Sequence, residues 1–198
     1  MTSTSWGGLL TLVAIAITTL SLVVLHVVPS GLKPLRDPVS QYGITRFKGW
    51  YAAAAITAGV AGIGAIVVFA DVPGSIATVI LLAVFAGARI VIPFVPMDAP
   101  DTGPTRRGRL HNVLAFLAFG AVTAAGFVAA GLLHDTNHAG ASTLSTVFAA
   151  VMAVGAIGLL VTRLSHRMRG LFGAAERLIY LGFIAWFVLV GATALGAA

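Results

Sequence analysis

The sequence lacks cysteine and has few charged residues. The absence of cysteine from all 198 residues excludes disulfides, cysteine-ligated zinc, iron–sulfur clusters and a cysteine nucleophile. Only 9% of the residues are charged and 59% are hydrophobic, whereas a soluble domain has about 25% charged and 45–50% apolar residues. This excess of apolar residues cannot be buried in one soluble core, so the composition predicts an integral membrane protein.

The amino-terminal stretch MTSTSWGGLL lacks the basic residues with which a secretory signal peptide begins. The apolar run that follows is too long for the core of a signal peptide, and it has no clear small-residue cleavage site. We therefore expect the first hydrophobic segment to be retained as a helix.

Six long apolar runs make up most of the chain. A helix needs about 20 apolar residues to cross a hydrocarbon core of about 30 Å. The runs cover about residues 7–29, 50–71, 75–95, 110–133, 142–163 and 175–196. They predict an all-α fold, a polytopic integral membrane protein in which residues 1–198 form one compact bundle of six transmembrane helices.

Lys and Arg are absent from two of the five connections between these runs and from both ends of the chain. The other three connections and their borders hold Lys33, Arg36, Arg46, Lys48, Arg106, Arg107, Arg109, Arg163, Arg167, Arg169 and Arg177. The positive-inside rule places these three connections in the cytoplasm and both termini on the extracytoplasmic side. The sequence thus predicts a multi-pass protein of the cell membrane whose basic charge attracts anionic lipid headgroups, with no nucleic-acid partner.

Small residues within the spans and aromatic residues near their ends are explained by the packing and anchoring of the helices. The segments GVAGIGAI and AVTAAGFVAAG allow helix backbones to approach closely, which favours a tight monomeric bundle over a dimer interface. The aromatic residues close to the predicted membrane surfaces are interpreted as interfacial anchors; they are Trp6, Trp50, Tyr51 and Tyr180.

Polar residues suited to chemistry gather near the predicted cytoplasmic ends of the spans. The segments HVVPSGLKPLRDPVSQYG and PFVPMDAPDTGPTRRGRLH hold most of them. We predict acid–base chemistry from Asp98 and His111, oriented by Asp37 and Ser40, as the catalytic group. The predicted substrate-binding group is Arg89, Arg109, Tyr42 and His26.

Arg89 lies inside the third apolar run, nine residues before Asp98, which is about 13.5 Å along a continuous helix. A charge at that depth costs several kcal/mol unless it is paired, reaches the surface or faces a wet cavity. Two interpretations remain open. The side chain extends to the inner surface, or it turns inward to pair with Asp37, Asp98 or an anionic headgroup.

The start of the fourth run also has two interpretations. The helix dipole and the arginines of TRRGR favour an anion such as a phosphate or carboxylate. Alternatively, Thr105 caps the helix and the arginines only set the topology. Ser40 lacks the glycines of a nucleophile elbow and is interpreted as the cap of a turn or helix start.

Metal binding is not predicted. His26, His111, Asp37 and Asp98 are suitable zinc ligands by type, but no pair has the spacing of a metal motif. The segment HDTNH at 134–138 is interpreted as a solvated turn. No cofactor is indicated.

The segments HVVPSGLKPLRDPVSQYG, IPFVPMDAPDTGPTRRGRLHN and LIYLGFIAWFVLVGATAL resemble a bacterial and archaeal membrane family, known as domain of unknown function 998. The resemblance covers essentially the whole chain and implies about six spans. Its matching positions are Pro38, Ser40, Tyr42, Gly43, Pro96, Asp98, Gly108 and His111. Gln41 stands where family members often carry Asp. The family has no established activity, so the resemblance implies a site without naming a reaction.

Three functions remain open from the sequence. The first is a membrane enzyme or lipid-binding protein whose polar cytoplasmic site acts on an anionic lipid or small amphiphile, with membrane lipid as the partner. The second is a small transporter, although the outer halves of the spans lack charged residues and no inverted repeat is evident. The third is a structural or assembly subunit of a larger complex, or an oligomer.

Overall fold

The computed structural model describes residues 2–100 and 102–196. The six long helices are α1 (Ser3–Val27), α2 (Lys48–Phe69), α3 (Ile76–Val91), α4 (Arg106–Asp135), α5 (Ala139–Leu164) and α6 (Phe172–Ala194). Three short 3-10 helices join them, η1 (Val39–Ile44), η2 (Ile92–Phe94) and η3 (Arg169–Leu171). The all-α prediction with six spans is confirmed, since each long helix, α3 together with η2, is long and apolar enough to cross a membrane.

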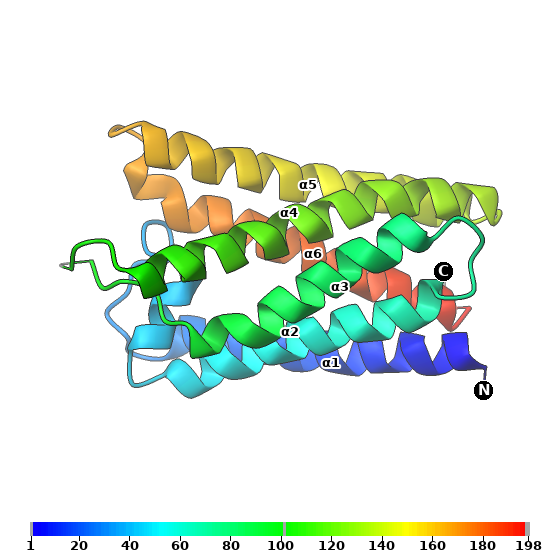
Figure 1. Ribbon diagram of the computed structural model, residues 1–198, viewed down its shortest axis with the longest axis horizontal. Helices are drawn as coiled ribbons and strands as arrows, with labels where there is room; N and C mark the ends of the chain where they lie inside the picture. The colour runs from blue at the N-terminus through cyan, green and yellow to red at the C-terminus, as the bar shows by residue number, and fades with distance from the viewer. Residues whose placement is uncertain (1, 101, 197–198) are drawn as a thin grey trace.

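The six helices lie side by side along one bundle (Figure 1), and their contacts close into a ring. Each helix packs against the next one in the chain, and α1 packs against α6. The short connections explain part of this order, because a chain that turns back within a few residues, as between α2 and α3 and between α4 and α5, places consecutive helices side by side and antiparallel. Contacts of α6 with α2 and α4 show that α6 also reaches across the ring.

The two ends of the bundle differ in their connections (Figure 1). The described parts of residues 28–47, 95–105 and 165–171 lie together at one end, which we call the basic end. Both chain ends and the short connections around Asp71 and Thr136 lie at the opposite end. The three basic connections thus lie on one side, as the charge pattern predicts, while their location in the cytoplasm stays a prediction.

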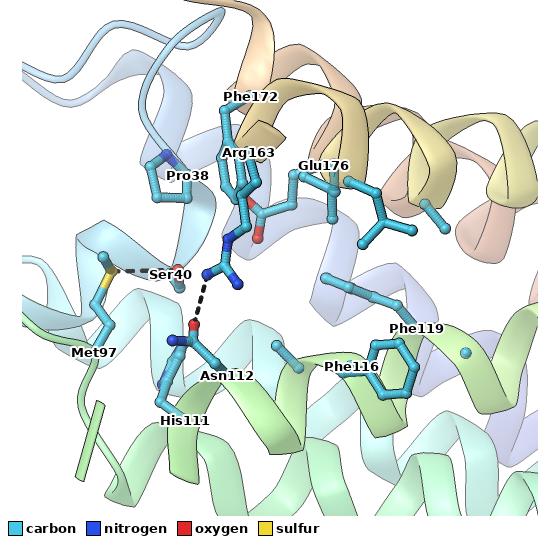
Figure 2. A pocket seen from close by; sticks show the side chains of 15 residues that line it. Pro38, Ser40, Met97, His111, Asn112, Phe116, Phe119, Arg163, Phe172 and Glu176 are labelled. Atoms are coloured by element: carbon cyan, nitrogen blue, oxygen red, sulfur yellow. Dashed lines mark hydrogen bonds between the residues drawn. The ribbon is translucent and has the colours of Figure 1, made fainter. Parts of the chain in front are cut away.

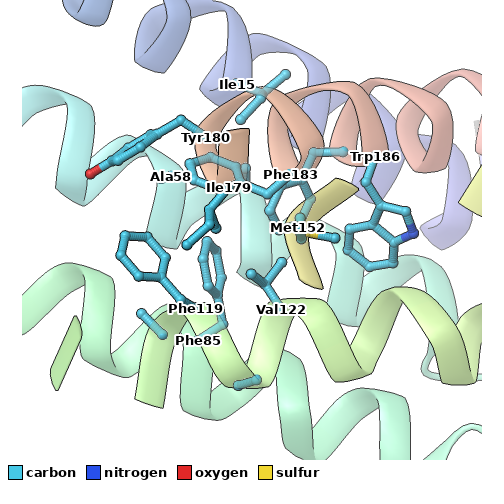
Figure 3. Close-up of a cluster of buried hydrophobic side chains, with 14 of the residues drawn as sticks. Ile15, Ala58, Phe85, Phe119, Val122, Met152, Ile179, Tyr180, Phe183 and Trp186 are labelled. Atoms are coloured by element: carbon cyan, nitrogen blue, oxygen red, sulfur yellow. The ribbon is translucent and has the colours of Figure 1, made fainter. Parts of the chain in front are cut away.

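The core is built from aromatic and small residues (Figure 3). Phe85 of α3 meets Phe183 of α6 with ring centroids 5.8 Å apart. The indole N–H of Trp186 donates to Ser145 Oγ at 2.8 Å, and that hydroxyl donates to the Gly126 carbonyl at 2.7 Å. Three helices, α4, α5 and α6, are therefore joined by polar contacts within an apolar core, where such bonds have no competing water.

Close helix approach depends on the small residues of the predicted segments. A Cβ added at Gly64 in α2 would lie 2.8 Å from the Gly7 carbonyl oxygen of α1, and one at Gly59 would lie 2.9 Å from the Ala86 carbonyl oxygen of α3. Larger side chains at these positions would separate the backbones. The tight packing predicted from GVAGIGAI is confirmed.

The interpretation of Tyr51 and Tyr180 as interfacial anchors is wrong. Their side chains are only 3% and 4% exposed, whereas Trp6 and Trp50 are 58% and 43% exposed. Both side chains therefore lie inside the bundle, where the Tyr180 hydroxyl accepts a hydrogen bond from Arg89 and the Tyr51 hydroxyl has no partner among the described residues. The position of a tyrosine in the sequence therefore predicted its depth in the membrane, but not whether its side chain points into the bundle or toward the lipid.

Candidate functional site

The first connection docks onto the beginning of α6. The backbone N–H groups of Gly173 and Ala174 donate to the carbonyl oxygens of Arg36 and Leu35 at 3.2 and 2.9 Å. These N–H groups belong to the first helical turn, which has no partners within the helix. A side chain at Gly173 would overlap the Pro34 carbonyl, so glycine permits the contact.

Glu176 holds the segment DPVSQYG in place. Its Oε2 accepts a hydrogen bond of 2.7 Å from the backbone N–H of Val39, the first residue of η1. Glu176 is 4% exposed and is the only glutamate in the sequence. The Val39 N–H, which has no acceptor within η1, thus donates to a carboxylate 137 residues away in the chain. The bond satisfies the N–H and stabilises the buried carboxylate.

Arg177 joins the same connection to α1. Its Nε donates to His26 Nε2 at 2.8 Å, and one terminal nitrogen donates to the Asp37 carbonyl oxygen at 3.0 Å. His26 Nδ1 lies 2.7 Å from the Leu22 carbonyl, which only a protonated nitrogen can satisfy. Both ring nitrogens of His26 are therefore engaged within the protein, and the predicted role of His26 in substrate binding is not supported by a free donor or acceptor.

Asp37 closes a turn within the first connection. Its carboxylate accepts from the Lys33 N–H at 2.7 Å and from Arg36 Nε at 3.0 Å. Burial by itself raises the pKa of Asp37, but these bonds and the positive charges of Arg36 and Lys33 outweigh it and hold the pKa below its usual value.

Asp98 caps the entry to α4. Its carboxylate accepts from the Thr105 hydroxyl at 2.6 Å and the Thr105 N–H at 3.1 Å, while the same hydroxyl accepts from the Gly108 N–H at 3.0 Å. The hydrogen bonds from Thr105 lower the pKa of Asp98. A side chain at Gly108 would overlap the Asp98 carboxylate. The predicted Thr105 cap is confirmed, and Arg109 lies exposed beside it.

His111 lies one turn into α4 and is 3% exposed. Its Nδ1 is 2.6 Å from the Val95 carbonyl oxygen, so Nδ1 carries the proton. Among the described residues, Nε2 has no hydrogen-bond partner. This tautomer presents Nε2 as an acceptor when the ring is neutral.

A pocket of about 210 Å³ opens beside His111, between α4, α5 and α6 (Figure 2). Its apolar wall is formed by Ala115, Phe116, Phe119, Gly120, Ala156, Leu159, Leu160 and Phe172. At the basic end it is lined by Pro38, Ser40, Met97, His111, Asn112, Arg163 and Glu176. The pocket is therefore amphipathic, with its polar groups collected at the basic end.

The pocket reaches the outer surface of the bundle. Two of its apolar lining residues, Phe116 and Leu160, are 70% and 56% exposed, so they face the lipid that surrounds a membrane bundle. Arg163 spans the polar part, where it donates to Asn112 Oδ1 at 3.1 Å and lies 6.0 Å from the centre of the Phe172 ring. A ligand could thus contact both the polar groups and the bilayer.

Arg89 turns inward, as one of the two sequence-based interpretations expects, but its partner is neither aspartate. The helix ends at Val91, so Arg89 lies in its last turn, and the 13.5 Å estimated along a continuous helix does not apply. The side chain is 1% exposed and donates to the Tyr180 hydroxyl at 3.2 Å. Extension to the surface and pairing with Asp37 or Asp98 are both wrong.

The environment of Arg89 holds further unpaired polar atoms. Arg89 Nε and one terminal nitrogen, and the Tyr51 hydroxyl, have no hydrogen-bond partner among the described residues. The guanidinium lies close enough to three other polar side chains to interact with them electrostatically, namely Tyr51, Tyr180 and Glu176. Phe119, whose ring centroid is 5.8 Å from that of Tyr180, and Glu176 both line the pocket, so the pocket adjoins this buried cluster.

The structure brings two of the eight predicted site residues into the pocket, Ser40 and His111. The Ser40 hydroxyl donates to Met97 Sδ at 3.3 Å, and it caps neither a turn nor a helix start, so that interpretation is wrong. The other six do not line the pocket. Asp37 closes a turn, Asp98 binds Thr105 at the entry to α4, and Tyr42 is a buried residue of η1. His26 binds Arg177, Arg109 is exposed, and Arg89 is enclosed.

The sequence analysis did not identify Glu176, Asn112 or Arg163 as site residues. Glu176 could have been found from the sequence, because a glutamate inside a predicted span is as costly to place in the membrane as Arg89 is. Arg163 was assigned only to topology, and Asn112 had no distinguishing pattern. In the part of the chain that the structure describes, no group of three metal-ligating residues occurs.

Residues 12–193 match a protein family whose description is "Protein of unknown function (DUF998)". The match spans most of the bundle, from the third turn of α1 to the last turn of α6. No curated protein and no solved structure matches the chain significantly.

Proposed function

The chain belongs to the DUF998 family of membrane proteins of unknown function, and we propose that it binds a membrane amphiphile in the pocket between α4, α5 and α6. One observation carries this proposal. The pocket has an apolar wall that continues to the lipid-facing surface at Phe116 and Leu160, and a polar part at the basic end.

The dimensions favour a ligand that remains partly in the bilayer. Pockets that enclose a drug-sized molecule have volumes of about 300–1,000 Å³, and this one has about 210 Å³. A head group and the first part of an acyl chain would occupy it, and the rest of the chain would pass between Phe116 and Leu160 into the lipid.

Arg163 is the proposed contact for an anionic group of the head. The sequence assigned that role to Arg89 and Arg109, but neither lines the pocket. A guanidinium has five N–H donors in a fork that fits a phosphate or carboxylate, and the described contacts of Arg163 use one terminal nitrogen. His111 Nε2 is the group in the pocket best suited to act as a general base if the ligand is also processed.

The test is to fill the pocket by mutation. Gly120 lines the pocket in α4, is exposed, and has open space where a side chain would begin. Gly120→Trp is expected to abolish the lipid that co-purifies with the chain, as measured by native mass spectrometry in a mild detergent. Gly131→Trp is the matched control, because Gly131 is also exposed in α4 with open space around it but does not line the pocket.

A second comparison tests the charge. Arg163→Gln is expected to weaken lipid retention about tenfold, whereas Arg167→Gln removes the same charge from an exposed position outside the pocket and is expected to leave it unchanged. If Gly120→Trp and Gly131→Trp retain equal amounts of lipid, the pocket is not the binding site.

A further inference from the structure

Glu176 contributes more to the pocket than a contact to the first connection. Its Oε2 is occupied by the Val39 N–H, while Oε1 has no hydrogen-bond partner among the described residues. The carboxylate lines the pocket (Figure 2), although the residue as a whole is only 4% exposed. Oε1 is not among the enclosed polar atoms that lack a partner, so it is open to the pocket, where it can accept a hydrogen bond from a ligand.

His111 adds a second acceptor to the same pocket. The Val95 carbonyl fixes the proton of the neutral ring on Nδ1, which leaves the lone pair on Nε2 for a ligand. Two acceptors that line one small pocket suit a group with several N–H donors. A primary ammonium has three such donors and a positive charge.

The buried charges argue against a purely anionic ligand. Arg89 and Glu176 are the two charged residues of the spans that are at most 4% exposed, and their formal charges cancel, +1 and −1. An anion placed beside Glu176 would bring two like charges together in a low-dielectric region, and a cation alone would leave an excess positive charge. A ligand with one charge of each sign keeps the balance, with its anionic group at the exposed Arg163.

We propose that the amphiphile is zwitterionic, and that its head group places a primary ammonium against Glu176 and His111 Nε2 and an anionic group, such as a phosphate, against Arg163. This inference rests on the proposed function, because it names the class of ligand that the same pocket accepts. It changes the expectation drawn from the sequence, in which an anionic head group was sufficient.

The experiment compares three monoacyl lipids that share one acyl chain and a phosphate. Their heads are phosphoethanolamine, with a primary ammonium, phosphoglycerol, with no cation, and phosphocholine, whose quaternary ammonium has no N–H. Dissociation constants are measured by titration in native mass spectrometry on the purified full chain. The wild-type chain is expected to bind phosphoethanolamine at least tenfold more tightly than either of the other two heads.

The variants assign this preference to a residue. Glu176→Gln keeps an acceptor for Val39 and removes the charge, so the preference for phosphoethanolamine over phosphoglycerol is expected to fall below threefold. Arg163→Gln is expected to weaken the binding of all three lipids equally, because all three carry the phosphate, and to keep the preference for phosphoethanolamine. If Glu176→Gln does not fold, the comparison of ethanolamine with choline in the wild-type chain still tests the N–H donors.

The outcomes separate the two proposals. Equal binding of the three heads by the wild-type chain, or a preference that persists in Glu176→Gln, overturns the zwitterionic ligand while amphiphile binding stands. If none of the lipids binds, or if Gly120→Trp binds them as well as the wild-type chain, the proposed function fails together with this inference.

Discussion

The carboxylate of Glu176 in the last helix accepts a hydrogen bond of 2.7 Å from the backbone N–H of Val39 in the first connection. Val39 itself is 1% exposed, so its N–H has no access to water as a substitute partner. This single contact places Pro38 and Ser40, on either side of Val39, at the edge of the pocket.

Glu176→Ala is expected to destabilise the chain by about 1–3 kcal/mol, because it leaves the buried Val39 N–H without an acceptor. Glu176→Gln retains an acceptor of the same shape and is expected to lose less than half of that amount. The measurement is thermal unfolding in detergent, followed by intrinsic fluorescence. Equal losses in the two variants would show that the charge of Glu176, and not the acceptor, supports the fold.

Arg89 and Tyr180 are expected to be energetically coupled. The Tyr180 hydroxyl is the only described hydrogen-bond acceptor of the buried guanidinium, so Tyr180→Phe should cost about 1–3 kcal/mol. In an Arg89→Met background the same change should cost less than about 0.5 kcal/mol, because no buried charge remains to be satisfied. Additive losses in this double-mutant cycle would contradict the coupling.

Gly108→Ala is expected to disrupt the entry to α4. The new Cβ would overlap the Asp98 carboxylate. Asp98 would then move away from Thr105, the N-cap residue of α4, at a cost of about 1–2 kcal/mol. Gly131→Ala is the control, since Gly131 lies in the same helix with open space around it, and alanine there is expected to be neutral or stabilising. The unfolding midpoint of Gly108→Ala should therefore fall below the wild-type value, whereas that of Gly131→Ala should equal or exceed it.

Asp37 is expected to make the stability of the first connection dependent on pH. Its pKa is lowered in the folded chain, so its contribution is complete above the unfolded value of about 3.9 and is lost as the pH falls through the folded value. The difference in unfolding midpoint between the wild-type chain and Asp37→Asn should be largest above about pH 5 and should shrink toward pH 3. Asp71→Asn, at an exposed position of the opposite end, is the control; a pH-independent difference for Asp37→Asn would refute the prediction.

The orientation in the membrane can be tested because the chain has no cysteine. Gly170→Cys introduces a thiol at an exposed position of the basic end with open space around it, and Asp71→Cys introduces one at the opposite end. A membrane-impermeant maleimide is expected to label Asp71→Cys in intact cells and Gly170→Cys only in inside-out vesicles. The reverse pattern would place the basic end outside.

Much of the fold could be predicted from the sequence because hydropathy and helix entry are local properties. The six spans follow from runs of about 20 apolar residues, and the largest errors in their ends are four residues, at the beginnings of α1 and α4 and at the end of α3. The Thr105 cap also depends only on residues a few positions apart. The basic residues lie at one end because successive helices reverse direction.

The site could be predicted only in part. Ser40 and His111 were identified from polar segments that the bundle does bring together. Tyr51 and Tyr180 were assigned to the membrane surface because the sequence gives their depth but not the direction in which their side chains point. Arg89 was paired with the wrong residues for the same reason, since its partner comes from the face of α6 that turns toward α3.

The sequence by itself determined that this chain spans a membrane six times and that its polar segments share one end. Only the tertiary structure decided which of those residues form a pocket, because Glu176 meets Val39 across 137 residues and Arg163 meets Asn112 across 51. Such pairs depend on the order of helices around the ring and on the rotation of each helix about its axis. Packing between the helices sets both, and no local pattern in the chain encodes them.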